Sequence, residues 1–143
     1  MRIVRHTKND NEFEASWNIR VEVFVKEQNV PIGLELDEHD ETAVHVLAYD
    51  NDEPVGCGRL VFFDEYAQIG RVAVLQSQRK LGVGKAICEE LMAIAVERQA
   101  KKVTLHAQLS AEKFYKKLGF TPEGEVFLDA GIDHINMFKL IYI

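Results

Sequence analysis

The feature that most constrains the fold of this chain is a basic, glycine-containing turn that directly follows a short apolar run. The apolar run covers residues 69–75, and residues 78–85 of the turn read QRKLGVGK. An apolar run, a tight turn and an amphipathic segment in this order predict a strand that passes into a helix. The first N–H groups of that helix have no partner within it, and its dipole adds partial positive charge there. We therefore expect phosphate groups to bind at this turn.

The residue types of the turn suit a polyanionic ligand. Gly82 and Gly84 let a ligand approach the backbone without meeting a Cβ atom. Positive charge comes from Arg79, Lys80 and Lys85. Two familiar phosphate motifs are excluded: a Walker loop needs glycine where Arg79 stands, and a dinucleotide fingerprint needs a third glycine three residues after Gly84. The expected ligand is a phosphorylated molecule held by a different kind of turn.

Length and composition place the chain among single-domain globular proteins. Its 143 residues predict one domain over 1–143, and 47% hydrophobic with 28% charged residues is typical of a soluble protein. The formal net charge of −6 argues against binding to nucleic acid or to an anionic membrane surface. The chain has no apolar run of roughly 20 residues and no signal-peptide pattern at its start, so we expect a cytoplasmic protein.

Cysteine and histidine usage gives no sign of a disulfide framework or a metal site. Cys57 and Cys88 are the two cysteines, and we expect them to be small buried hydrophobic residues. The five histidines lack the spacing of a helical zinc site, so no metal is expected. The sequence also lacks the Gly-x-Ser-x-Gly elbow of a serine hydrolase.

Apolar periodicity predicts an α/β protein with one mixed sheet. Strands are expected at residues 2–7, 44–49, 55–63, 103–108, 126–128 and 135–141, and a turn near residues 64–65 is expected to lead to a further strand that ends at Leu75. A first helix, capped by Asp10 or Asn11, is expected to bury Phe13, Trp17, Val21 and Phe24, and a second, over about 82–99, to bury Ile87, Leu91, Ile94 and Ala95. A polar loop over residues 29–41 and a short helix capped by Ser110 and ended by Gly119 complete the order. This order predicts one twisted sheet with helices on both faces.

Motifs downstream of the turn resemble the GNAT acyl-CoA N-acyltransferase superfamily. The order Arg79-x-x-Gly82-x-Gly84, helix, strand and then FYKKLGF from Phe114 is similar to that family's pyrophosphate loop and helix end. Residues 20–28, 35–37 and 129–134 further resemble a small bacterial branch, the ElaA- and YjcF-like proteins. The resemblance covers nearly the whole chain, and it implies a mostly antiparallel sheet that splays at its centre.

The resemblance implies acetyl transfer from acetyl-CoA, as a co-substrate, to an amine by direct attack in a ternary complex. The pantetheine arm would pair with the free edge of the strand at Val72, Ala73 and Val74, as an added strand does, and the Val74 amide is a candidate oxyanion donor. The residues implied to bind the cofactor are Val72, Ala73, Val74, Arg79, Lys80, Leu81, Gly82, Val83, Gly84, Lys85 and Phe114.

Proton transfer needs an acid and a base. The resemblance implies that Tyr115 is the general acid for the departing thiolate, a role that a phenol can fill. A base must take a proton from the amine, which is mostly charged at neutral pH. Glu27 and His134 are the first candidates for this base. Other candidates in these segments and on the neighbouring strands are Glu35, Asp37, Arg59, Arg71 and His106.

Two other functions remain open from the sequence. The chain could be a non-catalytic acyl-CoA-binding sensor, because a protein can keep its cofactor-binding site after losing its catalytic activity. An acyl-homoserine-lactone synthase is a further alternative, although the chain is short and shows no wide basic surface for an acyl-carrier protein. The acceptor is a small molecule or a peptide amine, and its pocket is expected to involve the loop 28–40, the start of the first helix and the turn 129–134. A homodimer is possible.

Overall fold

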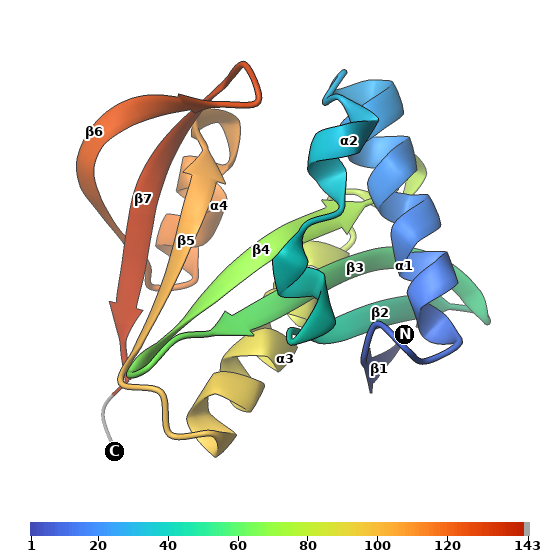
Figure 1. Ribbon diagram of the computed structural model, residues 1–143, viewed down its shortest axis with the longest axis horizontal. Helices are drawn as coiled ribbons and strands as arrows, with labels where there is room; N and C mark the ends of the chain where they lie inside the picture. The colour runs from blue at the N-terminus through green and yellow to red at the C-terminus, as the bar shows by residue number, and fades with distance from the viewer. Residues whose placement is uncertain (142–143) are drawn as a thin grey trace.

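Seven strands form one twisted sheet in the order β1-β2-β3-β4-β5-β7-β6, in a computed structural model that describes residues 1–141 (Figure 1). The strands are β1 (Arg2–His6), β2 (Val44–Asp50), β3 (Glu53–Phe62), β4 (Tyr66–Val74), β5 (Lys102–Gln108), β6 (Thr121–Asp129) and β7 (Ile132–Leu140). Every neighbouring pair is antiparallel except β4 and β5, which are parallel. The expected mixed and mostly antiparallel sheet is confirmed.

Helices and helical turns connect the strands. They are α1 (Glu12–Arg20), the π-helix η1 (Val21–Glu27), α2 (Ile32–Glu35), η2 (Glu38–Glu41), η3 (Gln76–Gln78), α3 (Val83–Glu97), η4 (Leu109–Ala111) and α4 (Glu112–Lys117). The π-helix η1 follows α1 directly, and such segments are often found at functional sites. None of the helices within residues 1–141 is long and apolar enough to cross a membrane.

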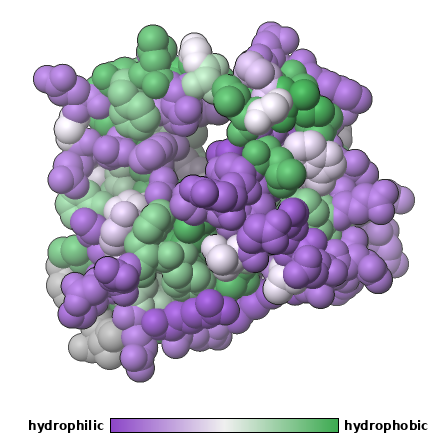
Figure 2. All heavy atoms as spheres, in the orientation of Figure 1, coloured by the Kyte–Doolittle hydropathy of each residue, from purple (hydrophilic) through white to green (hydrophobic). Residues whose placement is uncertain are grey.

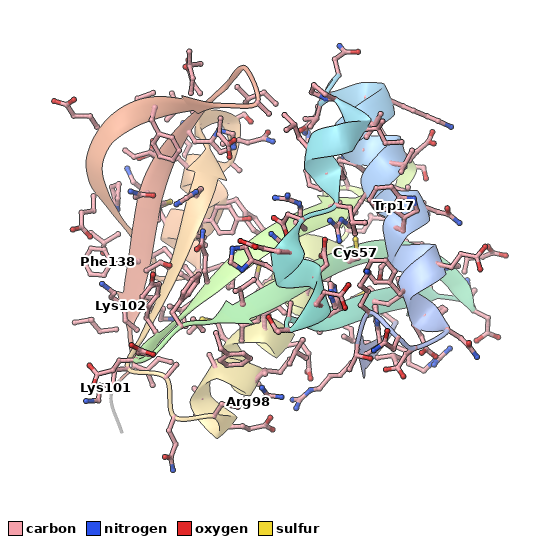
Figure 3. The ribbon with its side chains drawn as sticks, in the orientation of Figure 1. Trp17, Cys57, Arg98, Lys101, Lys102 and Phe138 are labelled. Carbon is pink, nitrogen blue, oxygen red and sulfur yellow. The ribbon has the colours of Figure 1, made fainter. Side chains whose placement is uncertain are left out.

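The two faces of the sheet carry separate hydrophobic clusters, because successive side chains of a strand point to opposite faces. Val46 and Ala48 of β2 pack in the larger cluster with α3, and Leu47 packs in the smaller cluster with Ile19 of α1. Helices therefore cover both faces, as expected. Cys57, labelled in Figure 3, belongs to the smaller cluster. Burial raises the pKa of Cys57 and of Cys88 to about 12, so both thiols are protonated and buried, as expected.

Helix α3 packs close to the sheet because β3 presents glycine beneath it. A Cβ atom on Gly56 would lie 2.8 Å from Ile87 Cδ1 and 2.9 Å from a methyl of Val83. A Cβ atom on Gly58 would lie 2.9 Å from Ile87. This close contact fixes the height of α3 above the sheet, and with it the position of the turn that starts the helix. Ile87 and Leu91 are buried as the sequence predicts.

Strands β4 and β5 pair only along their first halves. Their register runs from Tyr66 opposite Lys102 to Ile69 opposite Leu105 and ends there. A bulge between β3 and β4 follows at once, since Cys57 lies opposite Ala73 whereas Arg59 lies opposite Gly70. Beyond this point the two strands separate, as Figure 1 shows, while Lys101 and Lys102 lie where they converge (Figure 3). The predicted splay at the centre of the sheet is confirmed.

The first helix buries a different stripe from the predicted one. Its buried residues are Ser16, Ile19 and Arg20, followed by Val23 of η1. The predicted stripe of Phe13, Trp17, Val21 and Phe24 is only half-buried. Two polar contacts set this rotation: Ser16 Oγ lies 2.8 Å from Nε2 of the buried His6, and Arg20 enters a buried set of ion pairs described below. Hydrophobic periodicity could not show that an arginine faces the interior.

Three local predictions were wrong for reasons that the structure explains. Residues 29–41 are not an open loop, because they form α2 and η2. Helix α1 has no side-chain cap: Asn11 stands at its N-cap position without a capping hydrogen bond, and the Asp10 carboxylate accepts from the Thr7 N–H. Helix α4 has none either, because Ala111 and not Ser110 stands at its N-cap position. Strand β6 extends well before residue 126, because an edge strand tolerates Pro122 and an irregular register.

The glycine contact beneath α3 gives a prediction about stability. Gly56→Ala should lower the free energy of unfolding by about 1–3 kcal/mol, because the added methyl overpacks the contact with Ile87 and Val83. Urea denaturation followed by circular dichroism measures this. Gly33→Ala is the control, because a Cβ atom there meets nothing within 4 Å. Equal stability of the two variants would show that α3 can rise from the sheet without cost.

Candidate active site

The open edge of β4 presents backbone groups that β5 does not pair with at the splay. The Leu75 N–H donates to the Val55 carbonyl at 3.0 Å, so residue 75 points its backbone groups toward β3. Successive residues of a strand alternate between its two edges. The N–H and C=O groups of Val74 therefore point to the other edge, where β5 has moved away. An extended chain carrying amides can pair there as an added strand.

The predicted phosphate turn has the backbone shape that its glycines suggest. Lys80 and Gly82 both have positive φ, of 65° and 86°, and Gly82 lies directly before the first residue of α3. Gly84 lies against the ring of Phe114, whose Cζ would be 3.4 Å from an added Cβ atom. The N–H groups at the start of α3 point out from this turn, next to the open edge of β4. Lys80 and Lys85 are exposed beside it.

Two of the predicted site residues, Arg79 and Glu27, pair with each other. Both terminal nitrogens of Arg79 donate to the Glu27 carboxylate at 2.6 Å, and Arg79 Nε donates to the Val74 carbonyl at 3.0 Å. The guanidinium therefore braces the phosphate turn against η1 and β4. The hydrogen bond from Arg79 lowers the pKa of the Glu27 carboxyl, which makes Glu27 a weaker base.

A cavity of about 550 Å³ fills the space where the two arms of the sheet part. Its wall comes from η1, the segment 30–39, β3, β4, β5, α4 and the β6–β7 hairpin. Tyr115 and His134 line it, as do Glu35, Asp37, Arg59, Arg71 and His106, whereas Glu27 lies outside it. Figure 2 shows an opening between the arm of β5–β7 and the arm that carries α2. The structure thus brings together most of the predicted catalytic candidates.

Six charged side chains form a closed ring behind and within one wall of this cavity. Going around the ring, positive and negative groups alternate, and each contacts the next. The members in order are Arg20, Glu35, Arg71, Asp37, Arg59 and Asp40. They come from α1, α2, β4, the start of η2, β3 and η2 itself. The ring has three positive and three negative members, so its formal charges cancel.

The contacts within the ring are short and mostly buried. Arg20 lies 2.9 Å from the Glu35 carboxylate and 2.8 Å from that of Asp40. Arg59 lies 2.6 Å from Asp37 and 2.9 Å from Asp40. Arg20, Glu35 and Asp40 are at most 3% exposed. Each member contacts two members of opposite charge, although the buried Nε of Arg59 has no hydrogen-bond partner within residues 1–141. We name this set the ionic ring and treat it as the anchor of the segment 32–41.

Arg71 closes the ionic ring from the bulge on β4. It lies 3.1 Å from the Glu35 carboxylate and 3.2 Å from that of Asp37. Its φ of 51° lies in the left-handed region, which costs energy for a residue with a side chain. The ring therefore holds the strained residue at the point where β4 leaves β5.

Burial and the ring partners shift the two buried carboxyl groups in opposite directions. Burial raises the pKa of Glu35, and its arginine neighbours only partly oppose this. At Asp40 burial acts in the same direction, but the hydrogen bond and charge of Arg20 outweigh it and hold the pKa well below its usual range. Asp40 is consequently the more firmly ionised of the two carboxylates.

Tyr115 of α4 lines the cavity and also packs against the larger hydrophobic cluster, which contains buried residues of α3. Its ring packs edge-on against Phe114 and Phe120, with centroids 5.0 and 6.1 Å away. Within residues 1–141 its hydroxyl makes no side-chain or backbone hydrogen bond, and burial raises its pKa. The phenol is therefore protonated at neutral pH and has a proton to give.

His134 is held in one orientation by its own hairpin. Nδ1 lies 2.7 Å from the Ile132 carbonyl, which can only accept, so Nδ1 carries the proton and Nε2 keeps its lone pair. The ring stacks on Phe127 at 5.9 Å. On the paired strand Gln108 stands opposite His134, and its amide exchanges hydrogen bonds with that of Gln28 at 2.8 and 3.5 Å. This amide pair joins η1 to β5 across the cavity.

The part of the site that sequence reasoning missed is the pairing of its charges. The polar sequence of residues 35–40 predicts a solvated segment. Glu35 and Asp40 are buried because α2 and η2 bring them into contact with Arg20 and Arg59. The reciprocal Gln28 and Gln108 pair, 80 residues apart, also left no local signal. Among residues 1–141, no group of three or more His, Cys, Asp or Glu residues is arranged to hold a metal ion.

Comparisons with known proteins agree with this geometry. A family model described as an acetyltransferase (GNAT) domain matches residues 6–141. YjcF of Bacillus subtilis strain 168, described as an uncharacterized N-acetyltransferase, is 43% identical over 133 residues, which are 92% of this chain and 95% of that protein. The crystal structure of Escherichia coli ElaA is 30% identical, with a TM-score of 0.87 over 97% of this chain and 99% of that one. An acyl-CoA N-acyltransferase from Pseudomonas aeruginosa is 28% identical, with a TM-score of 0.86 and coverage of 96% and 98%.

The ionic ring gives a prediction about acid stability. Asp40→Asn should lower the free energy of unfolding by about 3 kcal/mol at pH 7, because Arg20 and Arg59 lose a buried partner. The folded-state pKa of Asp40 is lowered, so its contribution is present above the unfolded value of about 3.9 and is lost as the pH falls below it. The gap between wild type and variant should therefore narrow below about pH 4.

Urea denaturation at a series of pH values measures this gap. Glu38→Gln is the control, because Glu38 lies in the same turn but is exposed and outside the ring. A gap that stays constant down to pH 3 would contradict the assignment of the pH dependence to Asp40.

Proposed function

The chain belongs to the GNAT acetyltransferase family, and we propose that it transfers an acetyl group from acetyl-CoA to an amine by direct attack within a ternary complex. One observation carries the proposal: the open edge of β4 leads from Val72, which lines the cavity together with Tyr115, through Val74 toward the phosphate turn at Gly82. An extended arm with a phosphate at one end and a thioester at the other matches this layout.

Binding of acyl-CoA would use backbone groups more than side chains. The pantetheine amides would pair with the β4 edge at residues 72–74, and the pyrophosphate would meet the N–H groups at residues 80–84. Lys80 and Lys85 would add charge. Arg79 is already committed to Glu27 and Val74, so we assign it to positioning the turn rather than to direct phosphate contact.

The attack requires an oxyanion donor and a general acid. The N–H of Val74 points to the open edge and is a suitable donor for the thioester oxygen as it gains charge. Collapse of the tetrahedral intermediate breaks the C–S bond and expels a thiolate, which takes the phenolic proton of Tyr115. Burial raises the pKa of Tyr115, which keeps the phenol protonated before the reaction and makes it a weaker acid than a solvated phenol.

The amine must lose a proton during the attack, and we propose that His134 accepts it. Its Nε2 keeps a lone pair within the cavity wall, because Nδ1 is bonded to the Ile132 carbonyl. Glu27, the other first candidate, lies outside the cavity and is paired with Arg79. We therefore propose His134 as the base and Glu27 as a positioning residue.

The proposed reaction is tested by acetyl-CoA-dependent thiol release across a panel of amines, with Tyr115→Phe alongside wild type. We expect release with one class of amine, and a fall in kcat of about a hundredfold in the variant, as for loss of a general acid. The KM for acetyl-CoA should be unchanged. Tyr49→Phe is the control, since Tyr49 lies on β2 away from the cavity.

Silence across the panel in a protein that binds acetyl-CoA would instead favour a non-catalytic sensor of acyl-CoA. A Tyr115→Phe variant as active as the control would remove the tyrosine from the role of acid.

The two candidate bases are separated by pH–rate profiles. His134→Gln should abolish the rise of kcat/KM with pH that a titrating base produces. Glu27→Gln should keep that rise in kcat/KM. It should increase the KM for acetyl-CoA several-fold, which corresponds to about 1 kcal/mol, because the exposed ion pair of Arg79 and Glu27 holds the phosphate turn in place. A wild-type profile in His134→Gln, or a flat one in Glu27→Gln, would reverse the assignment.

A further inference from the structure

We propose that the acceptor carries a single positive charge on an apolar or uncharged body, and that the carboxylate of Asp129 binds its ammonium group. This inference rests on the proposed function, because it identifies the acceptor of the same cavity. Asp129 is the last residue of β6, at the tip of the hairpin whose next strand carries His134.

The first argument is that the other charges of the cavity wall are already matched. The charged residues that line the cavity are Glu35, Asp37, Arg59, Arg71 and Asp129. The first four belong to the ionic ring, where each one contacts two partners of opposite charge. Within residues 1–141 the side chain of Asp129 has neither a hydrogen bond nor an ion pair. It is therefore the carboxylate that an incoming cation can take without breaking an existing contact.

The second argument is the position of Asp129 beside the proposed base. Asp129 stands opposite Ile132 in the hairpin, and the Ile132 carbonyl is the group that orients His134. Burial lowers the pKa of the neighbouring His106, and the negative charge of Asp129 opposes that shift. The carboxylate thus acts on the same part of the cavity that both imidazoles line. An ammonium group bound at Asp129 lies next to a group that can take its proton.

The third argument concerns what a second charge on the acceptor would meet. A further ammonium group would find Glu35 and Asp37 held by arginines. A carboxylate would find Arg71 and the two terminal nitrogens of Arg59 held by acids, so that only the buried Nε of Arg59 could donate to it. Breaking such buried pairs is costly. An acceptor with two charges is consequently disfavoured by either sign of the second charge.

The remaining wall and rim suit an apolar body. Phe24, Val61 and Val72 line the cavity, and the lining residues Leu34 and Phe63 are 58% and 37% exposed at its edge. Figure 2 shows hydrophobic residues beside the opening on the arm that carries α2. Transfer of such side chains from water to an apolar ligand is favourable. The geometry therefore fits an alkyl or arylalkyl monoamine.

Matched pairs of amines test the inference by acetyl-CoA-dependent thiol release. Butylamine is compared with 1,4-diaminobutane, which adds one ammonium group, and 2-phenylethylamine is compared with phenylalanine, which adds one carboxylate. We expect kcat/KM to fall about tenfold or more with either added charge, as for an unmatched charge in a partly buried site. A diamine or an amino acid used as well as its monoamine would overturn the proposed class.

A pair of variants tests the residue. Asp129→Asn should raise the KM for 2-phenylethylamine about two- to fivefold, the range of an exposed charge pair, because Asp129 is exposed. The KM for acetyl-CoA should not change. Asp133→Asn is the matched control, because Asp133 lies in the same hairpin and is exposed, as Asp129 is, but does not line the cavity. Equal effects of the two substitutions would overturn the role of Asp129.

A binding measurement separates failure of this inference from failure of the proposed function. Calorimetry measures 2-phenylethylamine binding to the wild type, Asp129→Asn and Asp133→Asn proteins in the presence of coenzyme A, without turnover. Asp129-dependent binding without thiol release would refute the transferase and keep the acceptor class. Thiol release with preference for a polyamine or an amino acid would keep the transferase and refute the acceptor class. Neither binding nor release would overturn both.

Discussion

The closed ring of alternating charges is the interaction on which the cavity depends. Removing any one member leaves two neighbours of equal sign without their shared partner, in a region of low dielectric. The six members of the ring come from α1, α2, η2, β3 and β4. Their ion pairs hold a segment that is too polar to be held by hydrophobic packing. The ring fixes residues 32–41 to the sheet while leaving exposed apolar side chains on their outer side.

The same ring reaches the chemistry through one residue. Arg71 adopts a left-handed backbone at the bulge where β4 departs from β5, and its guanidinium is held by Glu35 and Asp37. The bulge is what leaves the edge at Val74 open. The ionic ring therefore connects the wall of the acceptor cavity to β4, the strand that would hold acyl-CoA. Strain at Arg71 is tolerated because its surroundings overdetermine it.

Local patterns were enough for most of the fold and for the phosphate turn. Most of the strands, the long helix α3 and the glycine turn before it follow from periodicity and glycine placement, which act over a few residues. The ionic ring could not be predicted in this way, because its pairs join residues 15 to 36 positions apart and its acids lie in a segment that reads as solvated. The burial of Arg20 rotated the first helix away from its predicted face for the same reason. Tyr115 and His134 were found through a family resemblance, and the geometry places both at the cavity without testing their roles.

The short parallel pairing of β4 and β5, which we call the seam, is a point about which the two arms of the sheet can rotate. Within residues 1–141 the strand pairing between them runs only from Tyr66 to Ile69, and its end is packed around Ile69 and Leu105, each 2% exposed. Beyond it each arm extends for several residues of about 3.3 Å. A rotation of a few degrees at the seam thus moves the far ends by roughly 1 Å, a displacement that matters for catalysis. The stiffness of a few buried aliphatic contacts at the pivot would then set how closely the distance between donor and acceptor is held.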